Sequence, residues 1–169
     1  MVHLSGFCVT ENRSYLVFEY ADNGSLADYL QSNSVLGLNW RQRLEIALDV
    51  ATGLAYLHNF VVPAYVHKDI KSSNVLLDRN FRAKIANFGL AKLAGEGFAV
   101  TRHVVGTKGY MAPEYVGQGI VTPKLDVFAF GVVMLELLSG KPAVIRGNGD
   151  VHTKVMLWTT YLRCTRKAK

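Results

Sequence analysis

Four short motifs follow one another between residues 67 and 131, and together they constrain the fold more than any other feature of the sequence. The first is His67–Asn74, with the sequence HKDIKSSN, and the second is Asn87–Gly89, with the sequence NFG. The third is Gly106–Glu114, GTKGYMAPE, and the fourth is Asp126–Gly131, DVFAFG. One polar octamer alone occurs in many loops, whereas chance does not plausibly produce all four in this order and spacing. They predict a single fold built around a polar site.

The first motif resembles the catalytic loop of protein kinases, H-x-D-x-K-x-x-N. The resemblance implies that Asp69 accepts a hydrogen bond from the substrate hydroxyl, that Lys71 steadies the transferring phosphate, and that Asn74 offers an oxygen to a metal ion. The stretches Leu16–Leu26 and His103–Tyr115 look most like plant receptor-like kinases of the LysM type, which take part in perceiving chitin-like oligosaccharides. The resemblance covers residues 2–142.

This resemblance implies a helix-dominated α+β fold, the large C-terminal lobe of a protein kinase with the last strands of the small lobe attached. Residues 1–20 would end the small lobe, residues 21–142 would form the large lobe, and residues 143–169 would be a divergent basic tail. Local patterns agree. Phe7–Thr10 and Ser14–Tyr20 read as a hairpin across a polar turn, and Val75–Leu77 and Ala83–Ala86 read as short strands.

Helical periodicity predicts three helices. Ser25 can cap a short helix that runs to about Gln31, and Asn39 is a plausible N-cap of a longer helix that ends near Asn59. The apolar face of this longer helix is predicted at Trp40, Leu44, Ala47, Ala51, Leu54 and His58. A buried helix follows Pro123 through Leu125, Val127, Phe130, Val133, Leu137 and Leu138, and Gly140 and Pro142 end it. A turn at 147–149 and an amphipathic stretch at Val155–Trp158 complete the pattern.

Carried over position by position, the resemblance implies a site for ATP and Mg²⁺. Phe18 would be the gatekeeper, the backbone of Glu19 and Ala21 would meet the adenine edge, and Leu76 would floor the ring. Ser25 would contact ribose, and Asn74 with Asn87 would hold the metal. In addition, Thr107 would brace Asp69, Thr101 is a candidate phosphosite, His67 and Phe88 would be packing residues, and Asp126 would accept hydrogen bonds from the catalytic-loop backbone.

The sequence departs from the family pattern at several points. Asn87 stands where an aspartate is expected, and an amide lacks the charge that Mg²⁺ favours in its oxygen ligands. Lys68 takes the place of an arginine and offers only a point charge. No G-x-G-x-x-G segment occurs, and the phosphate cover, strand lysine and helix glutamate would all precede Met1. Glu114 lacks an identified arginine partner, so a buried, unpaired carboxylate and a marginally stable, partly molten body are expected.

Composition limits the other classes of function. The net charge is +6, but residues 151–169 carry five basic residues and no acid, which leaves a nearly neutral body and no case for nucleic-acid binding. The two cysteines are too few for a disulfide framework and indicate a reducing environment. The longest apolar run, Val127–Leu135, is too short to cross a bilayer. By resemblance, the expected location is the cytoplasmic side of the plasma membrane, with a membrane contact only through a segment outside this chain.

Three hypotheses follow for function. The first is a pseudokinase-like signalling module of a LysM-type receptor-like kinase, which binds an active receptor-like kinase or another signalling protein. The second is a serine/threonine kinase of weak activity seen as a fragment, supported by the intact Asp69, Lys71 and Asn74. The third is a truncated product without a stable fold, suggested by the tail Tyr161–Lys169.

Overall fold

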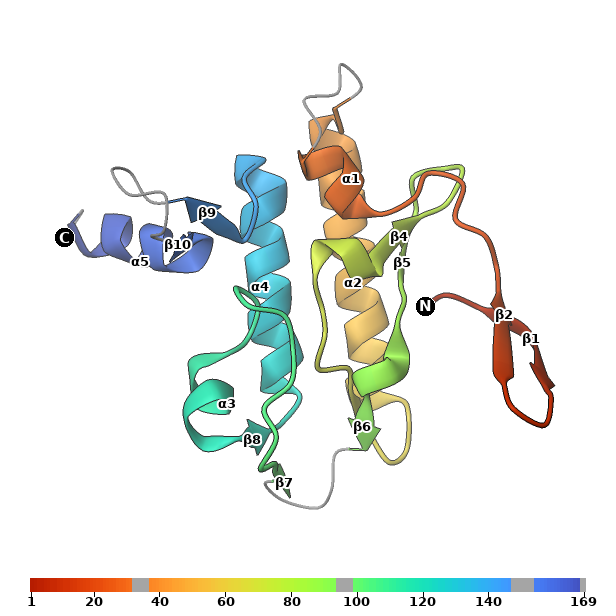
Figure 1. Ribbon diagram of the computed structural model, residues 1–169. Coiled ribbons are helices and arrows are strands. Elements are labelled where there is room, and N and C mark those ends of the chain that lie inside the picture. The colour runs from red at the N-terminus through yellow and green to blue at the C-terminus, as the bar shows by residue number, and fades with distance from the viewer. Residues whose placement is uncertain (32–36, 94–98, 147–153, 168–169) are drawn as a thin grey trace.

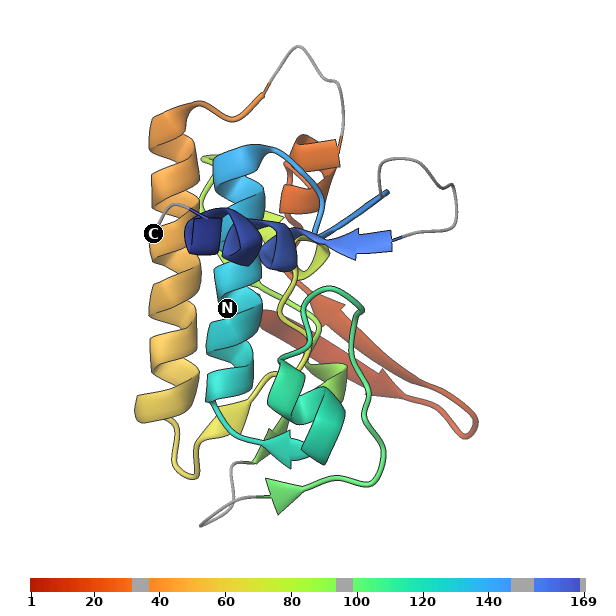
Figure 2. The same ribbon diagram turned by 90° about the vertical axis from the view of Figure 1, so that its left-hand side faces the viewer.

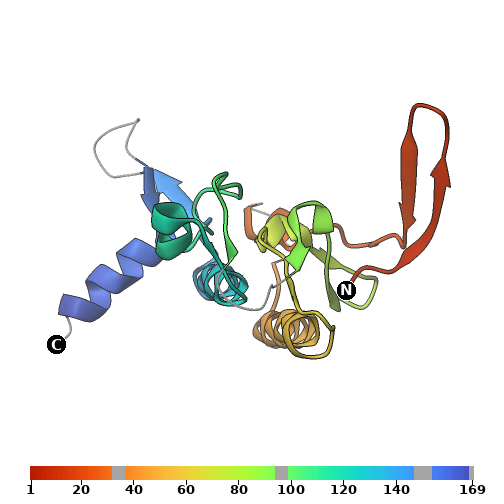
Figure 3. The ribbon, with the colours of Figure 1, turned by 90° about the horizontal axis from the view of Figure 1, so that it is seen from below.

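Two long antiparallel helices form the centre of the computed structural model, which describes residues 1–31, 37–93, 99–146 and 154–167 (Figure 1). Helix α2 spans Trp40–Asn59 and helix α4 spans Lys124–Ser139. Seen from below, an N-terminal hairpin stands on one side of this pair and the C-terminal helix on the other (Figure 3). The predicted helix-dominated α+β fold is therefore confirmed. Within the described ranges, no helix is long and apolar enough to span a membrane.

The other elements are short, and the strands pair two by two into antiparallel ladders. The further helices are α1 (Leu26–Gln31), α3 (Pro113–Gln118), α5 (Leu157–Lys167) and the 3-10 turns η1 (Ser72–Asn74) and η2 (Phe88–Leu90). The paired strands are β1 (Leu4–Val9) with β2 (Ser14–Phe18), β3 (Tyr65–Val66) with β6 (Lys92–Leu93), β4 (Val75–Leu77) with β5 (Ala83–Ile85), β7 (Ala99–Val100) with β8 (Ile120–Val121), and β9 (Val144–Arg146) with β10 (Lys154–Met156).

Helix α2 begins where its cap predicts. The Asn39 side chain accepts from the backbone N–H of Gln42, and the Gln42 side chain accepts from the backbone N–H of Asn39, so the two residues form a complete capping box. The predicted apolar face is only partly buried: Leu54 is buried, and Ala47, Ala51 and His58 are half-buried. The buried residues of α2 are Ile46, Val50, Leu54 and Leu57, whereas Trp40 and Leu44 are 57% and 52% exposed. The apolar residues at 40 and 44 instead line a shallow groove between α2 and α4.

Helix α4 is the buried helix that the sequence predicts after Pro123. It ends at Ser139 because Gly140 adopts the left-handed conformation, with a φ of 66°. Two of the predicted buried residues, Val127 and Leu138, are each 58% exposed, and Phe130 is half-buried. An almost continuous apolar sequence carries little periodicity, and it therefore does not indicate which side of the helix meets solvent.

The core lies between α1, α2, α4 and the β4–β5 ladder. Its largest fully buried members include Leu26, Ile46, Ile70, Leu77 and Ile85. A second cluster, around Tyr115 and Leu125, joins α3 to the start of α4. These two clusters position the loop after β3 and the turn after β5, and these are the segments that carry the first two sequence motifs.

The β1–β2 hairpin confirms the predicted pairing and lies apart from the core (Figure 1). Its side chains are mostly exposed, and Phe7 is 74% exposed. Two contacts join its ends to β5: the N–H of Val2 donates to the carbonyl of Ile85 over 2.9 Å, and Lys84 Nζ lies 2.5 Å from Glu19 Oε2.

The chain beyond Pro142 is folded where the structure describes it. Helix α5 lies against α4 on the side away from α2 (Figures 1 and 2), and Leu157 at its start is buried. The predicted turn at 147–149 lies outside the described residues. The expectation of a buried, unpaired Glu114 was wrong, because Glu114 is exposed in the first turn of α3 and incurs no desolvation penalty. That argument for a partly molten body therefore fails.

Candidate functional site

A buried aspartate in α4 holds the loop that carries the first motif. Asp126 accepts from the backbone N–H of His67 over 2.8 Å and from that of Lys68 over 2.9 Å, and its Oδ2 lies 2.8 Å from His58 Nε2. These bonds fix Lys68 at a φ of 69°, a left-handed conformation that costs energy in most residues. The Lys68 ammonium lies 5.7 Å from the ring centroid of Tyr115. The structural role predicted for Asp126 is confirmed.

His67 joins the loop to the turn after β5. It is fully buried, its Nε2 lies 3.0 Å from the carbonyl oxygen of Ala86, and its Nδ1 accepts from the N–H of Asp69. Burial lowers the pKa of His67, so the ring is held neutral. The ring meets Phe88 edge to face at 4.9 Å between centroids. His67 and Phe88 are therefore packing residues, as predicted, although Phe88 is only half-buried.

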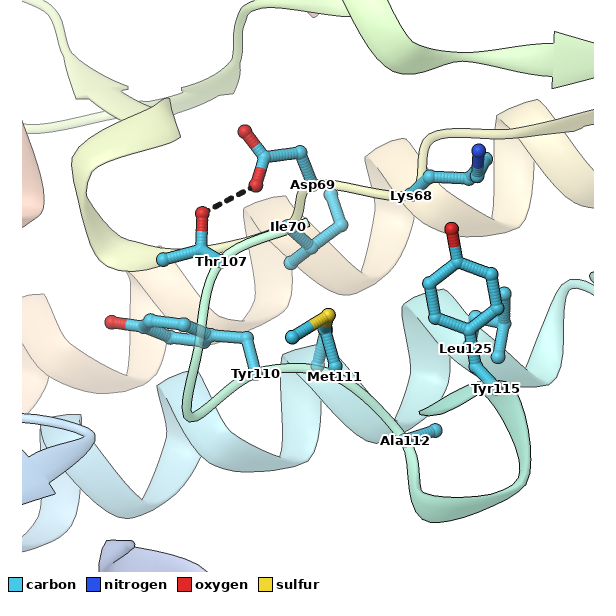
Figure 4. A pocket seen from close by; sticks show the side chains of 10 residues that line it. Lys68, Asp69, Ile70, Thr107, Tyr110, Met111, Ala112, Tyr115 and Leu125 are labelled. Atoms are coloured by element: carbon cyan, nitrogen blue, oxygen red, sulfur yellow. Dashed lines mark hydrogen bonds between the residues drawn. The ribbon is translucent and has the colours of Figure 1, made fainter. Parts of the chain in front are cut away.

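The Asp69 carboxylate is buried and accepts from three neighbouring side chains. Thr107 Oγ1 donates to Asp69 Oδ1 over 2.7 Å, the contact drawn in Figure 4. Asn74 Nδ2 donates to Asp69 Oδ2 over 3.0 Å, and Lys71 Nζ lies 3.1 Å from the same oxygen. Lys71 also donates to Thr107 over 2.9 Å. All four residues that were predicted to be catalytic thus meet in one cluster, and their chemical roles stay predictions.

Asn87 occupies a special backbone conformation at the edge of this cluster. Its φ is 66°, in the left-handed region that asparagine and aspartate adopt more readily than most residues. Asn87 is exposed, and its Nδ2 donates to Asn74 Oδ1 over 3.4 Å. Asparagine at this position therefore preserves the turn that begins η2 while removing the charge that an aspartate would supply.

The residues around Asn87 fit a bound Mg²⁺ poorly. The two expected ligands, Asn74 and Asn87, are neutral amides, and the Asn74 oxygen already accepts from the Asn87 amide. Asp69 is the nearby carboxylate, and Lys71, Thr107 and Asn74 already occupy its oxygens. Nor does the described part of the chain contain a group of three or more His, Cys, Asp or Glu that could hold a metal. Mg²⁺ favours charged oxygen ligands in tight geometry, and this cluster does not offer them.

A cavity of about 450 Å³ lies beside Asn87, between the end of β2, β4 and the start of η2. Four of the six residues predicted to bind nucleotide line it: Phe18, Glu19, Leu76 and Asn87. Sequence reasoning missed Val2, Leu16, Ala86, Phe88 and Gly89 as lining residues. Leu16 could have been predicted, because it lies two residues before Phe18 on the same strand and such residues share a face.

Ala21 and Ser25, the other two predicted nucleotide contacts, do not line the cavity. Ser25 forms a bridge with Leu76 in the antiparallel sense, and its hydroxyl donates to Asp28 over 2.7 Å. Ala21 accepts from the N–H of Gly24 over 3.1 Å. Neither residue therefore belongs to the set that lines the cavity.

The segment after β2 leaves several backbone groups without a hydrogen-bond partner in the described part of the chain. The N–H of Glu19 donates to His3, whereas neither the carbonyl of Glu19 nor the N–H of Ala21 makes a hydrogen bond within the described residues. The Glu19 carboxylate accepts from Lys84 and from the N–H of His3, and the bond from Lys84 lowers the pKa of Glu19. The side chain is thus already paired, and the free polar groups belong to the backbone.

Thr101, the predicted phosphosite, lies just after β7. Its N–H donates to Gly119 over 2.8 Å, and its hydroxyl donates to the carbonyl of His103 over 3.1 Å. A Cβ at Gly119 would meet the Thr101 carbonyl oxygen at 2.3 Å, so only glycine fits against this strand. Residues 94–98, which precede it, lie outside the described residues, and phosphorylation at Thr101 stays a prediction.

Sequence reasoning also missed a buried polar connection between the catalytic loop and α4. Tyr110 donates to Glu136 over 2.8 Å, and its hydroxyl lies 3.0 Å from that of Ser72. Glu136 is 1% exposed and also accepts from the N–H of Ala143. Burial raises the pKa of Glu136. No local pattern announces this contact, because it depends on how the third motif packs on α4.

Comparisons with known proteins agree with this arrangement. The sequence profile of the protein kinase domain matches residues 1–167, past the expected limit at Pro142. Protein LYK5 of Arabidopsis thaliana is 59% identical over 147 residues, which cover 85% of this chain and 22% of that protein. LysM domain receptor-like kinase 10 of Oryza sativa subsp. japonica is 54% identical over 154 residues, 89% of this chain and 25% of that protein.

Chitin elicitor receptor kinase 1 of Arabidopsis thaliana is 52% identical over 146 residues, which cover 86% of this chain and 23% of that protein. The chain thus spans about a quarter or less of the length of these curated relatives.

Proposed function

The chain belongs to the protein kinase family and is homologous to LysM receptor-like kinases, and from this premise we propose that it is a signalling module with impaired phosphoryl transfer. It acts by binding another signalling protein and presenting a kinase-shaped surface to it. Within this proposal, residues 21–142 are the large lobe, residues 1–20 end the small lobe, and residues 143–169 are a divergent basic tail whose helix α5 packs against α4.

The single observation that carries the proposal is the amide at Asn87. A unit charge about 4 Å from a dication, at an effective dielectric constant of about 20, is worth several kcal/mol before compensation. A loss of ~3 kcal/mol in the transition state corresponds to a reaction slower by roughly a hundredfold. The nearby carboxylate of Asp69 is already paired with Lys71 at 3.1 Å. It therefore compensates little for the negative charge that is missing at Asn87.

The rest of the cluster supports substrate-hydroxyl positioning. Asp69 would accept the hydrogen bond of a serine or threonine hydroxyl, and Thr107 and Asn74 would fix the carboxylate for that role. ATP is the nucleotide that the family implies, and it would occupy the cavity lined by Phe18 and Leu76. When bound, Mg²⁺ would neutralise the phosphates, but this chain's own residues would hold it weakly.

The proposed setting follows from the relatives. One of them is named chitin elicitor receptor kinase 1, and this name supports a proposed role of this chain in chitin-type signalling. The proposed location is the cytoplasmic side of the plasma membrane. The proposed partner is an active receptor-like kinase.

The binding role can be tested with the purified chain and the catalytic domain of an active LysM receptor-like kinase. We expect a complex with a dissociation constant in the micromolar range and a change in the partner's phosphorylation rate. Because this effect needs no transfer by the chain, Asp69→Asn is expected to change neither quantity. No complex at about 100 μM, or an effect that disappears with Asp69→Asn, would contradict the proposal.

A serine/threonine kinase of weak activity is the second candidate function. The meeting of Asp69, Lys71 and Thr107 within hydrogen-bonding distance favours it. This candidate requires phosphate incorporation into a substrate by a longer chain that includes these residues and the rest of the small lobe, and that incorporation must be lost in Asp69→Ala.

A further inference from the structure

All of the net positive charge of the chain lies beyond Gly140. Residues 1–140 carry equal numbers of basic and acidic residues, whereas residues 141–169 carry seven basic residues and one acid, Asp150. The seven basic residues are Lys141, Arg146, Lys154, Arg163, Arg166, Lys167 and Lys169. A neutral body with a basic end attracts anions at that end alone.

The structure gathers this basic segment on one side of the molecule. The β9–β10 ladder and helix α5 lie on the side of α4 away from α2, at the opposite end from the β1–β2 hairpin (Figures 1 and 3). Helix α5 contacts both α4 and β10. Lys141, between α4 and β9, lines a cavity of about 270 Å³ together with Tyr161 and Cys164 of α5. We call the surface formed by Lys141, the β9–β10 ladder and α5 the basic surface.

The protein does not neutralise the cations of the basic surface. Lys141, Lys154 and Arg163 are exposed, and none of them forms an ion pair within the part of the chain that the structure describes. The register of the β9–β10 ladder also places Lys154 opposite Arg146. Like charges directly opposite one another destabilise a pair of strands. An external anion at this surface would reduce that repulsion.

The apolar side of α5 fixes the helix on α4. Leu157 is buried, and Trp158 meets Phe128 of α4 edge to face, at 5.5 Å between ring centroids. An aromatic pair and a buried leucine together hold the first turn of the helix in place. Helix α5 therefore has one fixed orientation, in which Arg163 is exposed.

The second half of α5 combines cations with exposed apolar side chains. Arg163, Arg166 and Lys167 follow one another at spacings of three and four residues, which place residues on one side of a helix. Tyr161 and Leu162 are 38% and 49% exposed. Basic residues beside exposed apolar side chains are typical of helices that lie on a membrane surface.

Resting on the location proposed above, at the cytoplasmic side of the plasma membrane, we propose that the basic surface binds the anionic headgroups of a lipid bilayer. That leaflet is negatively charged and attracts basic segments. A bilayer offers an extended anionic surface over an apolar interior, which matches cations spread over a ladder and a helix. The contact is peripheral and is made by the chain itself, in addition to the contact expected through a segment outside it.

Co-sedimentation of the full chain with lipid vesicles tests this proposal. One kind of vesicle contains phosphatidylcholine alone, and the other contains about 30% phosphatidylserine. We expect binding to the phosphatidylserine vesicles to be tighter by about tenfold or more at about 0.1 M salt. Binding should be largely lost at about 0.5 M salt, because the screening length then falls to about 4 Å.

Two charge-matched variants locate the contact. The surface variant combines Lys154→Gln with Arg163→Gln, and the control combines Arg79→Gln with Lys124→Gln, at exposed positions outside the basic surface. Each basic residue near an anionic membrane changes the affinity by about fivefold, so the surface variant should bind about 25-fold more weakly. The control should stay within about threefold of the unchanged chain. The surface variant should remain folded, because Lys154→Gln removes a like charge opposite Arg146.

Equal binding to both kinds of vesicle, or equal weakening in the two variants, overturns this inference. Tighter binding to a soluble poly-glutamate peptide than to the phosphatidylserine vesicles overturns it in favour of an acidic protein surface. The proposed function has a different readout, the complex with an active kinase. Vesicle binding without such a complex would contradict the proposed function alone, and a complex without vesicle binding would contradict this inference alone.

Discussion

Replacing Asp126 by asparagine would remove one acceptor from the bonds that hold the loop after β3. In the native chain, Oδ1 accepts from the N–H of Lys68, and Oδ2 accepts from the N–H of His67 and lies 2.8 Å from His58 Nε2. Asp126 is 1% exposed, so water cannot replace a lost partner. Whichever way the new amide is oriented, its NH₂ group faces a backbone N–H, and the two donors repel one another.

The magnitude follows from these contacts. A hydrogen bond to a charged group contributes about 1.5–3 kcal/mol, and an unsatisfied buried donor costs about 1–3 kcal/mol. Losing one bond and opposing two donors should therefore lower the free energy of unfolding by about 2.5–6 kcal/mol. A domain of this size is typically stable by about 5–15 kcal/mol, so the loss would be a large fraction of the total.

Urea unfolding followed by circular dichroism measures this loss. If the free energy of unfolding depends on urea concentration with the same slope in both proteins, the folded state of the variant is native-like. The matched control is Asp22→Asn, an exposed aspartate, which should stay within about 0.5 kcal/mol of the unchanged chain. Hydrogen exchange at the amides of His67 and Lys68 should accelerate in the Asp126 variant. A destabilisation below about 1 kcal/mol, with both amides still protected, would refute the assignment of Asp126 as the anchor of this loop.

Three further predictions concern stability. Asn39→Ala removes the acceptor for the N–H of Gln42 and should cost about 1 kcal/mol in thermal or urea unfolding; no loss would mean that the capping box contributes nothing. Ile46→Ala should lower the free energy of unfolding by about 2–5 kcal/mol because Ile46 is fully buried. Leu44→Ala should lower it by less than about 1 kcal/mol because Leu44 is exposed, and equal losses would contradict the assignment of the buried face of α2. Because burial raises the pKa of Glu136 above its usual 4.5, the folded state holds this proton more tightly than the unfolded state does, so stability falls as pH rises from about 4.5 through the raised pKa. Glu136→Gln should flatten that fall in urea titrations at several pH values, and an unchanged pH profile would exclude Glu136 as its source.

The features that the sequence predicted well depend on neighbouring residues. The start of α2 follows from Asn39 and Gln42, three residues apart, and the end of α4 follows from Gly140. The β1–β2 pairing follows from alternation around a polar turn. The resemblance to protein kinases implied that Asp126 would hold the catalytic loop and that Thr107 would contact Asp69, and both contacts are present.

The features that it predicted poorly depend on which surfaces meet. Both the 40/44/47 face and the 46/50/54 face of α2 are apolar at helical spacing, and periodicity alone cannot choose between them. Packing against α4 and β5 buries the second face. The same limit explains two errors. Glu114 was expected to be buried and is exposed, whereas Glu136, which is buried and accepts from Tyr110, was not identified. Whether a carboxylate is buried depends on tertiary contacts, which the identity of one residue does not predict.

The most direct test of impaired transfer by this chain is a sensitive phosphoryl-transfer assay. The unchanged chain and its Asp69→Asn variant would be incubated with ATP labelled at the γ-phosphate, Mg²⁺ and a generic protein substrate, and the label incorporated into substrate would be counted over time. The account predicts that the two proteins incorporate label at the same background rate. Incorporation by the unchanged chain about tenfold or more above that of the variant would contradict it.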